Sequence, residues 1–213
     1  MHHQLMHEAE SLPSVVISSQ AAGNAVMMGG GYFTPLKGFM NVADAMGTCE
    51  NMRMADGSFF PVPVMCLLDS VDAIGEAKRI ALRDPNMEGN PVLAVMDVEA
   101  IEEVSDEQMA YMTEKVYRTD DAEHPGVAAF NGQGRFAVSG PIQVLHFSYF
   151  QDDFPDTFRT AVEIRNEIAE RGWKRIVAFQ TRNPMHLAHE ELCHMAMDRL
   201  DCDGLVIHML LGK

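Results

Sequence analysis

The chain has 213 residues, 47% of them hydrophobic, which is enough to bury the core of one large domain or of two small ones. Its net charge of -15 is carried almost entirely by residues 1–160, which hold 9 Lys and Arg but 23 Asp and Glu. This acidity argues against nucleic-acid binding, because phosphates are bound by clustered Lys and Arg. The apolar runs are too short for a membrane span and no secretory signal opens the chain, so we expect a cytoplasmic protein.

Residues 1–150 consist mainly of short apolar runs separated by Gly, Pro, Asn and Asp, a pattern that predicts a barrel-like or mixed β domain. The runs expected to form strands are residues 59–68, 91–98, 135–138 and 141–147. Residues 70–84 and 105–115 have the pattern of short helices. The glycines at 29–31 predict a flexible loop that lacks the Gly and Lys spacing of a phosphate-binding loop.

The pattern changes after Asp156. The expected elements are a helix at 157–171 that ends at Gly172, strands buried on both faces at 175–180 and 205–211, and a helix from 184 to about 201 between the strands. This order predicts a right-handed βαβ unit with a parallel sheet. We expect two domains, at 1–152 and 153–213. Because a doubly wound sheet needs more strands than these, we expect the chain to be the N-terminal part of a longer protein.

Several hydrogen-bond donors meet at the turn between the first strand and the helix of this unit. Gln180 ends the strand, and Asn183 followed by proline is typical of an N-cap and a first helical residue. Arg182 lies in the turn, where its guanidinium can bind an oxyanion with two hydrogen bonds. His186 and His189 share one face of the first helical turns. The combination predicts a binding site for oxyanions.

A metal site is a weaker interpretation of the same residues. Zinc proteases place two histidines four residues apart with Glu directly after the first, whereas these are three apart and Leu187 follows His186. The four cysteines lack CxxC spacing, so we expect reduced thiols and no metal held by the protein. His146 and His208 lie in apolar runs and are expected to be core residues with satisfied hydrogen bonds.

Residues 177–191 (VAFQTRNPMHLAHEE) resemble the joint Gln-x-Arg-Asn and His-x-x-His signature of the ATP sulfurylase (sulfate adenylyltransferase) family. Further similar segments, in the family's order, are residues 34–40 (TPLKGFM), 124–127 (HPGV), 140–142 (GPI) and 172–173 (GW). The similarity therefore covers essentially the whole chain.

The resemblance implies an α/β protein in which a PUA-like, β-rich barrel domain is followed by the start of a Rossmann-type nucleotidyltransferase domain. It implies that ATP and sulfate give adenosine 5′-phosphosulfate (APS) and pyrophosphate. Gln180 and Arg182 would hold sulfate, and Thr181, Arg182 and Asn183 would form the active centre. His186 and His189 would stabilise charge on the phosphates, and ATP would contact all six residues.

We expect direct in-line attack of sulfate on the α-phosphorus, Mg²⁺ bound together with ATP, and a homo-oligomer in the full-length protein. Leu187 stands where many members have Arg, and the family's later Gly-Arg-Asp loop would lie after Lys213, so we expect no turnover from these 213 residues alone. Two alternatives remain, another His-x-x-His nucleotidyltransferase and a non-catalytic assembly fragment.

Overall fold

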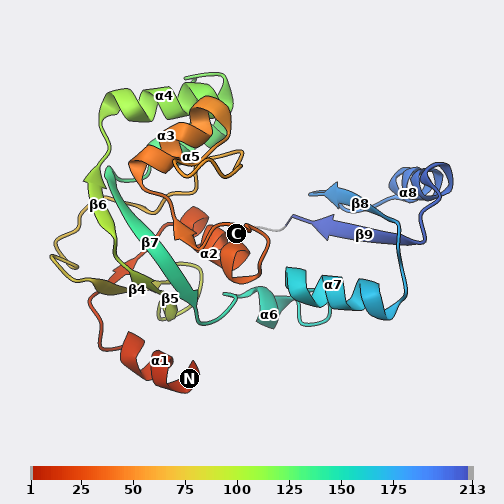
Figure 1. Ribbon diagram of the computed structural model, residues 1–213, viewed down its shortest axis with the longest axis horizontal. Helices are drawn as coiled ribbons and strands as arrows, with labels where there is room; N and C mark the ends of the chain where they lie inside the picture. Colours follow the sequence, from red (N-terminus) through yellow and green to blue (C-terminus); the bar gives the residue numbers. More distant parts are fainter. Residues whose placement is uncertain (1, 211–213) are drawn as a thin grey trace. The chain divides into compact units, whose positions relative to one another are not determined.

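The computed structural model describes residues 2–210, which form two compact units, residues 2–158 (unit 1) and 159–210 (unit 2). Unit 1 is a mixed α/β structure built around one curled sheet (Figure 1). The strands of its main path, in spatial order, are β1 (Ser14–Val16), β4 (Arg79–Arg83), β5 (Val92–Asp97), β7 (Phe136–Val144) and β2 (Gly38–Phe39). Strands β3 (Leu67–Leu68) and β6 (Ala100–Glu103) also pair with β7.

Strand β7 organises the sheet because it changes partners along its length. Its first half pairs with β3 and β6, and its second half pairs with β2 and β5. The change occurs at Gly140, which has a φ of 143° and whose missing side chain leaves room for the carbonyl of Asp97. The two runs expected as separate strands, 135–138 and 141–147, are thus largely one bent strand.

The helices of unit 1 pack against both halves of this sheet. They are α1 (His2–Ala9), α2 (Ser19–Gly29), α3 (Val42–Asn51), α4 (Asp106–Tyr117), α5 (Pro125–Asn131) and α6 (Phe150–Asp153). Helices α3, α4 and α5 gather at the start of β7 (Figure 1) around a cluster that includes Met109, Met112 and Phe130. Helix α2 covers the main sheet over Ile80, Leu82 and other buried side chains.

Two sequence-based expectations for unit 1 have opposite outcomes. The helix expected at 105–115 is confirmed as α4, and Ser105 and Gln108 form a reciprocal capping box at its start. The helix expected at 70–84 is wrong. Residues 72–76 form turns, and residues 79–83 form the central strand β4, whose Ile80, Ala81 and Leu82 are fully buried between β1 and β5.

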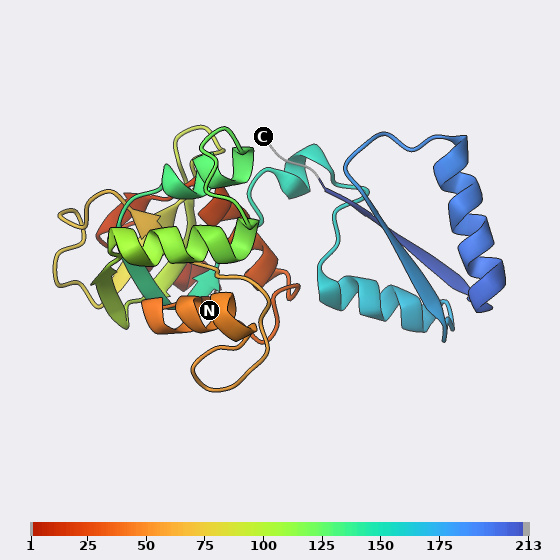
Figure 2. The same cartoon turned by 90° about the horizontal axis from the view of Figure 1, so that it is seen from above.

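Unit 2 contains α7 (Ala161–Glu170), β8 (Ile176–Thr181), α8 (Leu187–Leu200) and β9 (Gly204–Met209). Strands β8 and β9 pair in parallel over their whole length, and α8 packs beside them (Figure 2). The expected strand–helix–strand order with parallel pairing is therefore present. The expectation that both strands are buried on both faces is wrong, because α8 covers one side and Ile176, Gln180 and Ile207 are exposed.

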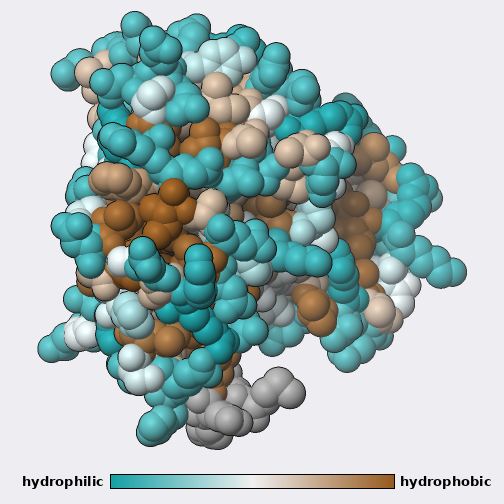
Figure 3. Space-filling view, turned by 60° about the vertical axis from the view of Figure 1, so that its left-hand side comes forward, coloured by the Kyte–Doolittle hydropathy of each residue, from teal (hydrophilic) through white to brown (hydrophobic). Residues whose placement is uncertain are grey.

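The surface carries apolar residues among hydrophilic ones (Figure 3). Exposed large apolar side chains occur in both units, for example Phe59 in unit 1 and Leu187, which is 78% exposed, in unit 2. Among residues 2–210, no helix has both the length and the apolar character needed to cross a membrane.

Candidate functional site

The predicted donors lie on the loop that leads from β8 to α8. Strand β8 ends at Thr181 and helix α8 begins at Leu187, so residues 182–186 form the loop. The expectation that Asn183 caps this helix and that the helix begins at residue 184 is wrong. His186 is the N-cap: its backbone is extended (φ -138°, ψ 172°), and its carbonyl accepts from the N–H groups of His189 (2.8 Å) and Glu190 (3.2 Å).

The Thr181 hydroxyl explains why the helix does not begin at Asn183. Thr181 is 8% exposed, and its Oγ1 accepts from the Asn183 N–H (3.1 Å) and donates to the Asn183 carbonyl (3.0 Å). Both backbone groups of Asn183 therefore have a partner outside the helix. The hydroxyl holds a tight turn directly after the strand and sets where the next residues begin.

Three exposed side chains, at the end of β8 and on the loop after it, have no partner among the described residues. Gln180, Arg182 and Asn183 are exposed, and none of their side chains forms a hydrogen bond or an ion pair with any residue between 2 and 210. Residues 182–186 include no Asp or Glu. An uncommitted guanidinium beside two amides is suited to bind an anion, because none of these donors first has to leave another partner.

The two histidines lie against each other at the start of α8. Their ring centroids are 3.9 Å apart, and the His186 N–H donates to Nδ1 of His189 at 3.4 Å. Since Nδ1 of His189 accepts, the proton of the neutral ring is on Nε2, where it can be donated to a ligand. Phe179 on β8 contacts the His189 ring, with centroids 5.6 Å apart. The pair is therefore packed against the strand.

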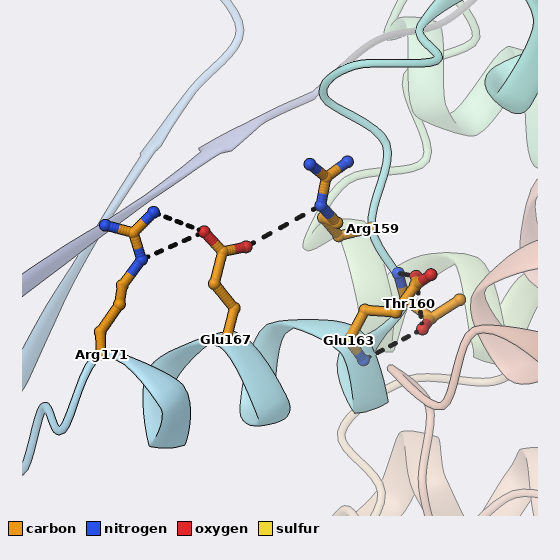
Figure 4. Close-up of polar contacts among 5 residues, drawn as sticks. All are labelled: Arg159, Thr160, Glu163, Glu167 and Arg171. Atoms are coloured by element: carbon orange, nitrogen blue, oxygen red, sulfur yellow. Dashed lines mark hydrogen bonds and ion pairs between the residues drawn. The ribbon is translucent and has the colours of Figure 1, made fainter.

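Polar contacts hold both ends of helix α7, which precedes strand β8 (Figure 4). At the N-terminus of α7, the N–H and hydroxyl of Thr160 donate to Glu163 Oε2 at 2.7 and 2.8 Å, and these hydrogen bonds lower the pKa of Glu163. Arg171 binds Glu167 at 2.7 Å near the other end. The expected cap at Gly172 is confirmed: its φ is 69°, and Trp173 N–H donates to the Ile168 carbonyl at 3.1 Å.

The opposite end of the sheet is held by Asp203, which precedes β9. Its carboxylate accepts from the backbone N–H groups of Lys174 (2.9 Å) and Arg175 (2.8 Å) before β8, and these hydrogen bonds lower the pKa of Asp203. Asp201 binds the Arg175 guanidinium at 3.1 Å. These two acidic side chains are thus bound at the amino ends of the strands, away from the loop with the donors.

Sequence reasoning missed one residue near the donors. His208, expected to be a core residue, is exposed on β9, and the parallel register pairs it with Gln180. No signal in the sequence gives this neighbour, because it depends on the register between β8 and β9. Leu187 is the first residue of α8. Among residues 2–210, no group of three or more His, Cys, Asp or Glu side chains is arranged to hold a metal ion.

Comparisons with known proteins match both units. Residues 1–147 match the family model described as a PUA-like domain, and residues 155–213 match the model described as ATP-sulfurylase. Two sulfate adenylyltransferases, from Allochromatium vinosum and from the Riftia pachyptila sulfur-oxidizing endosymbiont, are 73% and 74% identical over 212 residues. These alignments cover 100% of this chain and 53% and 48% of the relatives, so the chain spans about half of their length.

A solved structure is similar over the same extent. It is described as a hexameric APS kinase from Thiobacillus denitrificans, with a TM-score of 0.74 and 26% sequence identity. The match covers 100% of this chain and 37% of that one.

Proposed function

Since the chain belongs to the ATP sulfurylase family, we propose that it forms part of a sulfate adenylyltransferase that converts ATP and sulfate to APS and pyrophosphate. The observation that carries this proposal is the loop after β8. Together with Gln180 at the end of β8, it presents the unpaired guanidinium of Arg182 and the amide of Asn183 next to a pair of histidines at a helix N-terminus. Such a set of donors suits two anionic reactants.

The proposed roles are those that the similarity to the family implies. Gln180 and Arg182 hold sulfate, and Asn183 and Arg182 lie where sulfate meets the α-phosphate. His186 and His189 donate to the phosphates of ATP from the start of α8. Thr181 belongs to the active centre through the turn that it holds, because both hydrogen bonds of its hydroxyl go to the backbone of Asn183.

The reaction needs no covalent intermediate with the protein. A sulfate oxygen forms a bond to the α-phosphorus while the bond to the bridging oxygen of pyrophosphate breaks, and the electron pair leaves with pyrophosphate. Holding the two reactants in line can lower the barrier by roughly 7–11 kcal/mol. Arg182 and the histidines add about 1.5–3 kcal/mol for each hydrogen bond to charge.

Magnesium would enter bound to ATP. Proteins bind Mg²⁺ through one or two carboxylates, and residues 180–186 contain none, so these residues do not fit a protein-held Mg²⁺ site. When bound to the β- and γ-phosphates, the ion would neutralise charge on the leaving group. The protein's own residues would then act on sulfate and on the α-phosphate.

The architecture of the whole enzyme is part of the proposal. We place the domain boundary between residues 152 and 153 and assign the second domain to the Rossmann-type nucleotidyltransferases, which the parallel β8–α8–β9 unit supports. We propose a cytoplasmic homo-oligomer, and the similar APS kinase, which is described as hexameric, supports assembly. Because the chain spans about half of its relatives, we expect residues 1–213 alone to be inactive.

The test is ATP–pyrophosphate exchange in the full-length protein with and without sulfate. A sulfate adenylyltransferase exchanges only when sulfate is present, whereas a nucleotidyltransferase that acts on another substrate shows no sulfate requirement. Arg182→Ala should lower sulfate-dependent exchange about 10- to 100-fold, and Arg182→Lys should restore it only in part because lysine lacks the bidentate fork. Arg199→Ala, an exposed arginine in the last turn of α8, is the matched control.

ATP–pyrophosphate exchange at the same rate with and without sulfate would exclude this function and favour another His-x-x-His nucleotidyltransferase. An Arg182→Ala variant as active as Arg199→Ala would exclude the assigned anion site. Sustained APS synthesis by residues 1–213 would show that the described loop is a complete site.

A further inference from the structure

We propose that His208 is an additional sulfate-binding residue, which donates a hydrogen bond to the same anion as Gln180. This inference rests on the proposed function and extends its site from the loop to the neighbouring strand. The observation behind it is the juxtaposition of His208 and Gln180 across the parallel pair β8–β9.

The register places the two residues side by side. Gln180 and His208 are Cα partners in the parallel ladder, and neighbouring strands lie about 4.8 Å apart. Paired residues in a sheet point to the same face, so the amide and the imidazole lie on one face. Phe179 and Thr181, which flank Gln180, point to the opposite face, where Phe179 contacts His189 of α8.

Both side chains lie at the end of the sheet where a parallel α/β unit binds its ligands. Thr181 is the last residue of β8, Met209 is the last of β9, and each follows directly after one of the pair. Ligands of such sheets bind at the carboxyl ends of the strands. Gln180 and His208 are also both exposed, so an anion can reach them without rearrangement of the strands.

The charge distribution favours an anion between these two side chains. Neither β8, the loop at 182–186, nor β9 carries an Asp or Glu. Asp203 lies five residues before His208, about 16 Å along an extended strand, and its carboxylate is bound to two backbone N–H groups. The proposed role requires only that one ring nitrogen of His208 carries a hydrogen, which it donates to a sulfate oxygen.

Kinetics of the full-length enzyme test the proposal. His208→Ala should raise the KM for sulfate about 10- to 100-fold, the effect of one lost hydrogen bond to an anion, and leave the KM for ATP within about twofold. His208→Asn, which keeps a donor, should recover part of the sulfate affinity. The matched control is His194→Ala, an exposed histidine in the middle of α8, which should leave both constants unchanged.

The outcomes separate the inference from the function on which it rests. If the unaltered enzyme shows no sulfate-dependent exchange, the proposed function fails. If that exchange is present but His208→Ala leaves the KM for sulfate unchanged, or changes both KM values equally, His208 has no specific role toward sulfate. The unchanged KM for ATP also reports that the variant is folded, and His208→Asn repeats the test should His208→Ala be unstable.

Discussion

The two hydrogen bonds of the Thr181 hydroxyl to Asn183 provide a sharp test of how the loop is held. Thr181→Val keeps the shape of the side chain but removes both bonds, whereas Thr181→Ser keeps the hydroxyl and loses only a methyl group. Each bond contributes about 0.5–1.5 kcal/mol, and Asn183 is exposed, so water replaces part of the loss. The native position of the loop should therefore be destabilised by about 1–2 kcal/mol. This lowers its population relative to displaced positions by a factor of roughly 5–30.

We expect kcat of the full-length Thr181→Val enzyme to fall by about this factor, and kcat of Thr181→Ser to stay within about threefold of the unaltered enzyme. Hydrogen exchange of the Asn183 amide should accelerate in Thr181→Val and not in Thr181→Ser, because this amide donates to the hydroxyl. If kcat falls in Thr181→Val while the Asn183 amide exchanges as before, the hydroxyl acts on the substrate and the positioning role is wrong.

Three further predictions concern unit 1. Burial lowers the pKa of His146 below 6.5, so the unfolded state binds its proton first as the pH falls. The thermal midpoint of unfolding should therefore fall as the pH is lowered below 6.5, and it should fall less in His146→Gln. The same pH dependence of the midpoint in both proteins would contradict this prediction. Burial raises the pKa of Cys66 to about 12, so iodoacetamide should label it only after denaturation, as mass spectrometry can show. Gly38→Ala should lower the midpoint strongly because its Cβ would meet the Gly140 carbonyl, whereas Gly23→Ala, with open space inside α2, should stabilise by about 1 kcal/mol.

Local signals in the sequence were sufficient for elements that are stabilised locally. Helix α4 was predicted from its local pattern, and the structure shows that Ser105 and Gln108 cap it within one turn. The end of α7 was predicted because Gly172 can adopt positive φ. Helix α2 was not predicted; the sequence predicted only the loop at 29–31, where this helix ends. It forms because Ala21, Ala25 and other small residues are buried against the sheet, which is a tertiary effect.

Residues 70–84 illustrate the opposite error. Their spacing of apolar and charged residues is typical of a helix. Gly75, however, lies in a short turn at positive φ, and the apolar residues of β4 that follow pair with β1 on one side and β5 on the other. The burial of β8 was overestimated for a related reason. A compact apolar run indicates that a strand can be covered on both faces, and it does not state which elements cover it.

The candidate site was predictable to the level of residue types. Gln180, Arg182 and the histidines follow one another in the chain, so their meeting at one turn needed no tertiary information. The start of α8 was placed three residues too early, because Asn and Pro favour a helix start but the hydroxyl of Thr181 takes both backbone groups of Asn183. His208 could not be found from spacing alone, because its neighbour depends on the register between β8 and β9.

An acidic chain can bind two anions only if its few cations are not neutralised by its own carboxylates. The net charge is -15, so any Asp or Glu near Arg182 would compete with sulfate for the guanidinium. Three carboxylates of unit 2 have nearby partners of their own: Glu167 binds Arg171, Asp201 binds Arg175, and Asp203 binds two backbone N–H groups. The Arg182 guanidinium forms no hydrogen bond or ion pair with any residue between 2 and 210, so its donors remain for a ligand. The proposed site therefore depends on an arginine that stays unpaired in a chain with an excess of carboxylates.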